Sequence, residues 1–538
     1  MSNPPSKTVK KQSSSSTKTK SIAFSTIIMI IGLFLSKGSG FLRDIFVSRS
    51  FTQTYREAFT AAFLIPDFFF ALLVGGSIQS AITPTLSRAI EKKEDKKAWK
   101  GVSIFISWMT LVVLLFVVIG EVFSNKLYYL FNQNKSQEIV RLAGNMARTL
   151  YPQIFFMMLA ALCIGILNAY KKFGSTAFGP TIYNICVLLS IFFLGGSTED
   201  ALIRTGLGIM ASALIYFIFQ LFMGKKEISH FRPSLDTSNS EFRQLFKLAV
   251  PILISASVVQ INMLLLNSFA SRFDDGPLFA LRNAGTLWQL PYGIFAVGIG
   301  NVMLPSLAAH YAVKEYKKAS ELLSRSIKNA LFLAIPCAGI FLVLRSDIVR
   351  AAFKWSADYT EENIKMASLF LVGYCLSIVT QSVIFILNQA FYAIGKTRFP
   401  LFAGIVTMIV NVGLCFIFMT LDLGPLYLTI AYSAACVVRL ILLAWVYCKN
   451  KVLAPKKIRV FIVKSVICLV AMVGFLYLVE LLPWVPQRKV VQLFWVGARC
   501  ILGFVVYFVV AFLLKMEELT IAYQKYLGRF FRRKKKTS

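Results

Sequence analysis

Long apolar runs recur along the whole chain and are separated by short polar stretches. Each run has about 20 residues, the length that an α-helix needs to cross the hydrocarbon core of a bilayer. The runs are continuous, without the alternation over about ten residues that is typical of strands in outer-membrane barrels. The pattern therefore predicts an all-α polytopic membrane protein with fourteen transmembrane helices, over residues 22–48, 58–84, 102–124, 146–169, 178–195, 201–222, 245–270, 278–308, 328–345, 366–392, 399–420, 426–447, 460–482 and 491–514.

Two pairs of similar segments indicate an internal repeat. The segments "ITPTLSRAIEKK" and "MLPSLAAHYAVK" follow the second and the eighth predicted helix, and their prolines Pro84 and Pro305 are 221 residues apart. The segments "ILNAYKKFGSTAF" and "ILNQAFYAIGKTRF" place Gly174 and Gly395 at the same offset. We therefore predict two six-helix lobes with the same orientation, related by a pseudo-two-fold axis along the membrane normal, as in transporters whose lobes rock around a central site.

The repeat sets the predicted domain limits, with two C-terminal helices added outside it. The polar, Ser- and Lys-rich start of the chain is predicted to be a disordered tail. The predicted segments are a basic cytoplasmic tail over 1–21, an N-lobe over 22–222, a cytoplasmic linker over 223–244, a C-lobe over 245–447, the last two helices within 448–514 and a second basic cytoplasmic tail over 515–538.

The formal net charge of +33 is concentrated in short loops between the apolar runs. One alternate set of loops, which includes both tails, holds most of the Lys and Arg residues, so the positive-inside rule places both termini in the cytoplasm. This distribution argues against nucleic acid as a partner. The terminal "RFFRRKKK" is typical of a juxtamembrane tail that favours anionic membrane lipids.

Metal, disulfide and catalytic signatures do not stand out in the sequence. The nine cysteines lie mostly inside apolar runs and form no C-x-x-C pair. No Walker sequence, G-x-S-x-G or H-E-x-x-H motif occurs. We therefore expect no metal, no cofactor and no enzymatic activity, and transport would draw on an ion gradient, the membrane potential or the substrate gradient.

Several charged residues lie inside the apolar runs, where each costs roughly 2.5–3.5 kcal/mol on insertion scales. In the first run, the segment "LFLSKGSGFLRD" puts Lys37 and Asp44 on one face of a helix, with Arg43 beside them. The further charges are Glu57 and Asp67 near or in the second predicted helix, Arg282 in the eighth, and Arg439, Lys464 and Arg499 in the last three.

Two interpretations of these charges remain open. In one, Lys37, Arg43 and Arg282 line a hydrated cavity and bind an anion such as a phosphate, which arginine can engage with two hydrogen bonds. In the other, Arg43 pairs with Asp44 or Asp67 and only locks helices together. For Arg439 and Lys464 we expect snorkelling toward the cytoplasmic ends of their helices.

Several segments resemble the MurJ (MviN) lipid II flippases of the MOP exporter superfamily. They are "SKGSGFLRD", "EAFTAAFLIPDFFFALLVGGSIQSAITPTL", "WQLPYGIFAVGIGNVMLPSL" and "AFYAIGKTRFP", and the resemblance runs from about Phe34 to Ile417. It implies alternating-access transport of an undecaprenyl-pyrophosphate-linked peptidoglycan precursor from the inner to the outer leaflet of the bacterial cytoplasmic membrane. It also implies a cationic central cavity, a groove for the lipid tail at the last two helices, and cell-wall synthesis enzymes as candidate partners.

The resemblance carries over residue by residue, with some departures. Lys37 stands where arginine is usual in the family, and Glu57 where aspartate is frequent. Some members have an arginine at Phe70, a glutamate at Gly75 and an arginine at Thr286, one turn from Arg282. The predicted substrate-binding residues are Ser36, Lys37, Arg43, Asp44, Arg282, Asn283 and Thr286, and the predicted gating or helix-locking residues are Glu57, Asp67, Gly38 and Gly40.

Other functions remain as alternatives. A flippase for another lipid-linked glycan, such as a teichoic acid or capsule precursor, would differ only in how the head group fits the cavity. A non-transporting scaffold for cell-wall synthesis would not need the intramembrane charges. A multidrug antiporter of the same superfamily would have an acidic, aromatic-rich cavity, which the basic residues predicted here disfavour.

Overall fold

The computed structural model confirms the all-α fold class. Within the described residues, the chain forms helices and connecting loops and contains no β-strand. Eleven helices in this part of the chain are long and apolar enough to cross a membrane. The count of fourteen spans stays a prediction. The described residues are 31–32, 34–73, 77–131, 135–273, 277–396, 398–421, 424–449, 455–481 and 488–519.

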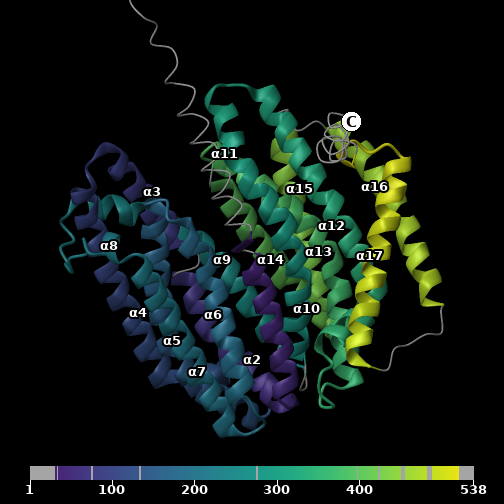
Figure 1. Cartoon of the computed structure of the whole chain (residues 1–538), viewed down its shortest axis with the longest axis horizontal. Coiled ribbons are helices and arrows are strands. Elements are labelled where there is room, and N and C mark those ends of the chain that lie inside the picture. The colour runs from purple at the N-terminus through teal and green to yellow at the C-terminus, as the bar shows by residue number, and fades with distance from the viewer. Residues whose placement is uncertain are drawn as a thin grey trace, which may run out of the picture.

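The first half of the chain forms one group of roughly parallel and antiparallel helices (Figure 1). At its centre, α5 packs against α2, α3, α4 and α7. The helices are one over residues 34–50, α2 (Gln53–Leu73), α3 (Ser77–Lys92), α4 (Asp95–Phe131), α5 (Gln137–Ala169), α6 (Phe173–Leu194), α7 (Glu199–Met223) and the short α8 (Lys225–Ile228).

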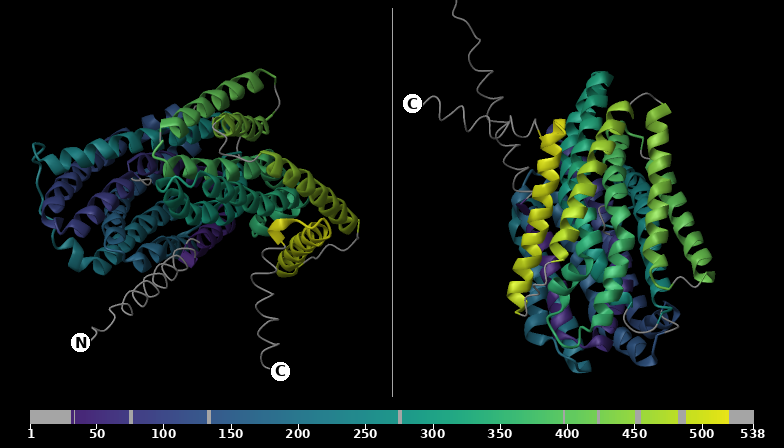
Figure 2. Two further views of the ribbon diagram at one scale, coloured as in Figure 1. Left: turned by 90° about the horizontal axis from the view of Figure 1, so that it is seen from above. Right: turned by 90° about the vertical axis from the view of Figure 1, so that its right-hand side faces the viewer.

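The second half repeats this arrangement, with α13 at its centre in contact with α10, α12 and α15. The last two helices, α16 and α17, pack against each other and against α12 at the side of the molecule (Figure 2). The helices are α9 (Ser240–Ala270), α10 (Pro277–Pro291), the π-helical turn η1 (Tyr292–Val297), α11 (Gly298–Ala312), α12 (Tyr316–Phe353), α13 (Glu361–Ala393), α14 (Arg398–Thr420), α15 (Tyr427–Lys449), α16 (Pro455–Glu480) and α17 (Lys489–Leu513).

Side-chain caps define where several of these helices begin. Ser136, Thr198 and Thr360 each accept a hydrogen bond from a backbone N–H in the first turn of α5, α7 and α13, and Asn239 does the same for α9. Such caps satisfy N–H groups that have no partner within the helix. The capped helix starts lie two to nine residues before the predicted starts at 146, 201, 245 and 366.

The predicted span over 278–308 is interrupted. It consists of α10, η1 and α11, and the π-helical turn begins directly after Pro291. Proline lacks the N–H that continues an α-helical ladder, so a local change of helical register at this point has a clear cause. Gly75, where some members of the resembled family have glutamate, lies outside the described residues.

Helix α9 connects the two halves. It follows α8 and a loop in the chain, and it packs against α2, α3 and α4 of the first half as well as α14 of the second. The predicted limits of the lobes stay a prediction, and α9 is the element that both halves share.

A close helix contact in the second half generates a stability prediction. A side-chain carbon added at Gly373 of α13 would lie 2.7 Å from Cβ and 3.2 Å from the backbone carbon of Thr429 in α15. Backbone cannot move aside easily, so we expect Gly373→Ala to lower the free energy of unfolding by about 1–3 kcal/mol. Gly413 of α14 has no atom within 4 Å of the same position, and Gly413→Ala is the matched control.

The measurement is thermal unfolding of the purified protein in detergent. Gly413→Ala should leave the midpoint unchanged or raise it slightly, because alanine favours helix more than glycine does. Equal midpoints for both variants would contradict the close packing of α13 and α15.

Candidate functional site

A cavity of about 400 Å³ lies between the two halves of the molecule. The helix over 34–50 and α2 line it from the first half, and α9, α10 and α13 line it from the second. Its walls contain the predicted site residues Arg43, Asp44, Asp67, Arg282 and Thr286. The structure thus brings together residues that are up to 242 positions apart in the chain.

Asp44 is the centre of this group. Its side chain is 1 % exposed, and its Oδ1 lies 3.2 Å from Arg43 Nη2 and 3.4 Å from Arg282 Nη2. Thr286 donates a hydrogen bond of 2.6 Å to Oδ2. One buried carboxylate therefore holds two guanidinium groups and a hydroxyl, and it ties the helix over 34–50 to α10. In a low-dielectric site such charge-assisted contacts are strong, and the loss of one partner is costly.

Asp67 supplies the second carboxylate of the site. It also lines a smaller cavity of about 190 Å³, together with Arg43, Arg282 and the hydrogen-bonded pair Gln153 and Tyr183. Arg43 is paired with Asp44, as the helix-locking interpretation allows. Asp67 lines the same two cavities as Arg43. Two arginines and two aspartates cancel in formal charge, so these four residues alone leave no surplus positive charge in the central cavity.

Lys37 lies two turns before Asp44 and is half-buried. Its side chain runs along η1, where a carbon added at Gly293 would lie 3.3 Å from Lys37 Cε. No carboxylate of the described residues lies within ion-pair distance of it. Lys37 is therefore a cation near the interface of the halves with no described counter-ion.

The neighbours of Lys37 have backbone roles. The carbonyl of Ser36 accepts a hydrogen bond from Asn184 Nδ2 of α6 at 3.1 Å. A side chain at Gly38 would meet no described atom within 4 Å, and one at Gly40 would meet only Asn184 Nδ2 at 3.8 Å. Close packing does not require glycine at either position in this conformation, and the gating or helix-locking role of Gly38 and Gly40 stays a prediction.

Six of the eleven predicted site residues do not line the central cavity: Ser36, Lys37, Gly38, Gly40, Glu57 and Asn283. Asn283 is fully buried, and its Nδ2 donates to the hydroxyl of Tyr359 at 3.0 Å. Glu57 accepts a hydrogen bond from the Phe279 N–H at 2.8 Å and forms an ion pair of 3.2 Å with Lys135. Asn283 therefore fixes α10 within the second half, and Glu57 links the two halves near the cavity.

Arg56 and Ser48 were missed in the sequence because they lie at the end of an apolar run, where a polar residue is normally solvated. Arg56 donates to the carbonyl of Asp358 at 2.7 Å, and Ser48 Oγ donates to the carbonyl of Phe353 at 2.8 Å. Both acceptors are backbone groups, which no pattern of side chains in the sequence reveals. Lys135, another missed residue, comes from a stretch that the sequence assigned to a loop.

The last two helices are held by charges inside the apolar part of the molecule. Arg499 of α17 contacts Asp347 of α12 at 2.5 Å and lies 5.6 Å from the ring centre of Trp495. Lys464 of α16 donates to the carbonyl of Leu514 at 2.8 Å, just beyond the end of α17. Arg499 is thus an ion-pair partner that joins α17 to α12.

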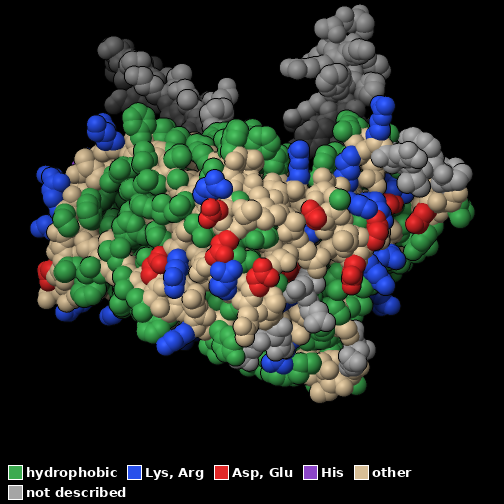
Figure 3. All heavy atoms as spheres, turned by 90° about the horizontal axis from the view of Figure 1, so that it is seen from below, with side chains coloured by type: hydrophobic (Ala, Val, Ile, Leu, Met, Phe, Trp, Pro, Cys, Tyr) green, Lys and Arg blue, Asp and Glu red, His purple; other side chains and the backbone are tan. Residues whose placement is uncertain are grey.

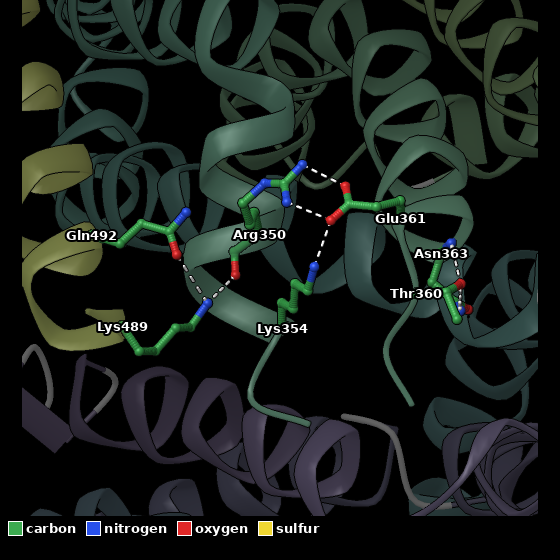
Figure 4. A network of polar contacts seen from close by, with 7 residues as sticks. All are labelled: Arg350, Lys354, Thr360, Glu361, Asn363, Lys489 and Gln492. Atoms are coloured by element: carbon green, nitrogen blue, oxygen red, sulfur yellow. Dashed lines mark hydrogen bonds and ion pairs between the residues drawn. The ribbon is translucent and has the colours of Figure 1, made fainter. Parts of the chain in front are cut away.

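A second network joins the same helices at the other end of α17 (Figure 4). Lys489 donates to the backbone carbonyl of Arg350 and, at 3.4 Å, to Gln492. The side chains of Arg350 and Lys354 both contact Glu361 at 2.5 Å. The Lys489 contact fixes the start of α17 against the last turn of α12, and the Glu361 contacts join the end of α12 to the start of α13.

Comparison with known proteins agrees with this architecture. The family model "Lipid II flippase MurJ" matches residues 48–495. A probable lipid II flippase MurJ from Rickettsia prowazekii (strain Madrid E) is 23% identical over 506 residues, 91% of this chain and 97% of the relative. A probable lipid II flippase MurJ from Rhizobium tropici is 27% identical over 384 residues, 69% of this chain and 71% of the relative.

Solved structures share the fold. The lipid II flippase MurJ in an inward closed conformation is similar with a TM-score of 0.76 and 24% identity, covering 93% of this chain and 100% of that chain. An inward-facing multidrug resistance MATE family transporter of the MOP superfamily is similar with a TM-score of 0.68 and 15% identity, covering 79% of this chain and 98% of that chain. With its polytopic fold and a family match over most of its length, the chain belongs to the MurJ lipid II flippase family.

Proposed function

We propose that this protein is a flippase that moves lipid II, an undecaprenyl-diphosphate-linked glycan, from the inner to the outer leaflet of the bacterial cytoplasmic membrane. The observation that carries the proposal is the pair of arginines, Arg43 and Arg282, held on Asp44 in a cavity between the two halves. Guanidinium groups bind phosphate oxygens through paired hydrogen bonds. The chain would act as a transporter and not as an enzyme, with cell-wall synthesis enzymes as candidate partners.

Asp44 suggests how binding and movement are linked. A diphosphate that enters the cavity competes with Asp44 for Arg43 and Arg282. Since Asp44 joins the helix over 34–50 to Arg282 and Thr286 of α10, this competition weakens a direct link between the halves. A ligand shifts a conformational equilibrium only when it binds one state better than the other, and an exchange of ion-pair partners supplies such a difference.

The contacts near residues 48–57 support a state that is closed toward the outside. The links from Ser48, Arg56 and Glu57 to the second half lie at the end of the molecule that the loop charges predict to be extracytoplasmic. Figure 3 views the molecule from this end, where basic and acidic side chains are interspersed. The head group would then enter from the cytoplasm, and the halves would separate at these links to release it outside.

The leading alternative is transport of another lipid-linked glycan. Such a substrate shares the diphosphate and would use the same arginines, so only the fit of the sugar part differs. A scaffold function is less well supported, because a scaffold has no need for a buried cluster of Arg43, Asp44 and Arg282 in a cavity.

Replacement of Arg43 tests the anion site. Cells depleted of their own lipid II flippase would receive the wild type, Arg43→Ala or the control Arg204→Ala, whose side chain is exposed on α7, at equal expression. A lost charge-assisted hydrogen bond costs about 1.5–3 kcal/mol, so we expect at least about a tenfold loss of rescue for Arg43→Ala. The control should rescue like the wild type.

Equal rescue by Arg43→Ala would contradict the anion role of this residue. A wild type that inserts normally but does not rescue would instead favour another lipid-linked glycan.

Asp44→Asn tests the link between the halves. The variant keeps the volume of the side chain but leaves Arg43 and Arg282 without their shared anion, so we expect a loss of about 3 kcal/mol in stability and impaired rescue. Thermal unfolding of the purified protein measures the first effect. Asp200→Asn, at the exposed start of α7, is the control and should stay within about 0.5 kcal/mol of the wild type. An unchanged unfolding midpoint for Asp44→Asn would show that the cluster does not hold the halves.

The proposed orientation is tested with cysteine labelling. Cys448 is exposed at the end of α15, on the side where both termini are proposed to lie. A membrane-impermeant maleimide should label it only after cells are opened, whereas Asp200→Cys in a Cys448→Ser background should react in intact cells. The reverse pattern would invert the proposed topology.

A further inference from the structure

A second cavity, of about 340 Å³, lies within the second half of the molecule. Its walls come from α9, α10, η1, α13, α14 and α15. It shares Met263, Trp288 and Gln289 with the central cavity, so the two spaces adjoin along one wall. A molecule bound in the central cavity would reach the second one by passing these three side chains.

Arg439 is the only charged side chain that lines this cavity among the described residues. It lies twelve residues after Tyr427 and ten before Lys449, the ends of α15, so it is close to the middle of the span. Ten helical residues correspond to about 15 Å, more than an arginine side chain can bridge. The expected snorkelling toward the cytoplasmic end does not account for this position.

The guanidinium of Arg439 has no described counter-ion. Its Nε is buried and makes no hydrogen bond among the described residues, and no described carboxylate lies within ion-pair distance. The stretch 248–260 of α9, whose side chains are largely undescribed, contains no Asp or Glu in its sequence. A cation at this depth is costly unless a water-filled cavity or an anion stabilises it.

The rest of the wall offers polar groups of neutral charge. Asn388 Oδ1 is buried and accepts no hydrogen bond in the described part of the chain. Gln381 Nε2 donates to the hydroxyl of Tyr432 at 2.9 Å, which fixes that amide beside the cavity. An unused acceptor, Asn388 Oδ1, and a cation without a described counter-ion, Arg439, line the same cavity. Such a pair suits a ligand that has both an N–H group and an anionic oxygen, as a peptide ending in a carboxylate does.

The charge balance of the two cavities differs accordingly. In the central cavity Arg43 and Arg282 face Asp44 and Asp67, and two arginines together suit a diphosphate. In the second cavity a single arginine faces amides and tyrosines, which suits one singly charged group.

We propose that the second cavity binds a carboxylate of the peptide part of the substrate, with Arg439 as its anion ligand and Asn388 as the acceptor for a peptide N–H. This inference rests on the proposed function, because lipid II carries a peptide with free carboxylates in addition to its diphosphate and sugars. The diphosphate occupies the central cavity, and the peptide reaches past Trp288 and Gln289 into the second half.

The test is equilibrium binding to the full chain in lipid nanodiscs. The ligands are lipid II and lipid II whose peptide carboxylates have been converted to amides. The proteins are the wild type, Arg439→Gln, Arg439→Lys and the control Arg345→Gln, an arginine of α12 that donates to the carbonyl of Leu342 and lies outside both cavities. The readout is the ratio of the two dissociation constants for each protein.

We expect the wild type and Arg345→Gln to bind lipid II at least tenfold more tightly than the amidated form. Arg439→Gln should bring this ratio close to one while its affinity for the amidated lipid stays near that of the wild type, and Arg439→Lys should restore part of the ratio. The comparison within one protein separates loss of the carboxylate contact from misfolding, which would weaken both ligands.

Two results would overturn the inference. If the ratio of dissociation constants is the same in Arg439→Gln as in the wild type, or is close to one in the wild type, Arg439 does not bind the carboxylate. Normal binding of the amidated lipid in that case would leave the proposed function intact. A wild type that binds neither lipid would overturn the proposed function and this inference together.

Discussion

A carboxylate buried between two guanidinium groups is the interaction on which the arrangement of the two halves depends. Asp44 lies in the helix over 34–50, and its partner Arg282 lies in α10, so the charges of one half are neutralised by the other. Burial makes each unpaired charge expensive, and the cluster is stable only while all partners are present. The same dependence on every partner makes the cluster sensitive to substrate, because a diphosphate offers Arg43 and Arg282 an alternative anion.

The remaining links between the halves are of a kind that can break and reform. Arg56 and Ser48 donate to backbone carbonyls of the second half. A neutral hydrogen bond such as that of Ser48 contributes about 1 kcal/mol net, and one from a charged group such as Arg56 about 1.5–3 kcal/mol. A few such contacts hold one end closed without making the closed state irreversible. By contrast, α17 is fixed to α12 by the ion pair of Arg499 with Asp347 and by the hydrogen bond of Lys489 to the Arg350 carbonyl, and α16 packs against both helices, so the two last helices should move with the second half.

The sequence predicted the fold class and much of the central site. Apolar runs of membrane-spanning length need no tertiary information to be recognised, and the charges of Arg43, Asp44 and Arg282 are conspicuous in such runs. What the pattern could not give is which anion pairs with which cation, because that depends on how helices far apart in the chain cross. Asn283 was predicted to be a substrate-binding residue beside Arg282, yet its side chain donates to the hydroxyl of Tyr359, which lies in the loop between α12 and α13. Arg439 was expected to snorkel toward the cytoplasmic end of its helix, although the predicted span over 426–447 already placed it eight residues from that end, and α15 ends ten residues beyond it.

The most direct test of the central claim is transport by the purified protein alone. Proteoliposomes would contain fluorescent lipid II in both leaflets, and an impermeant quencher would report how fast the inner pool reaches the outside. The account predicts faster exchange of lipid II with the wild type than in protein-free liposomes, and no acceleration for a phospholipid that carries the same fluorophore. Equal acceleration of both lipids, or of neither, would contradict transport through a cavity that recognises the diphosphate head group.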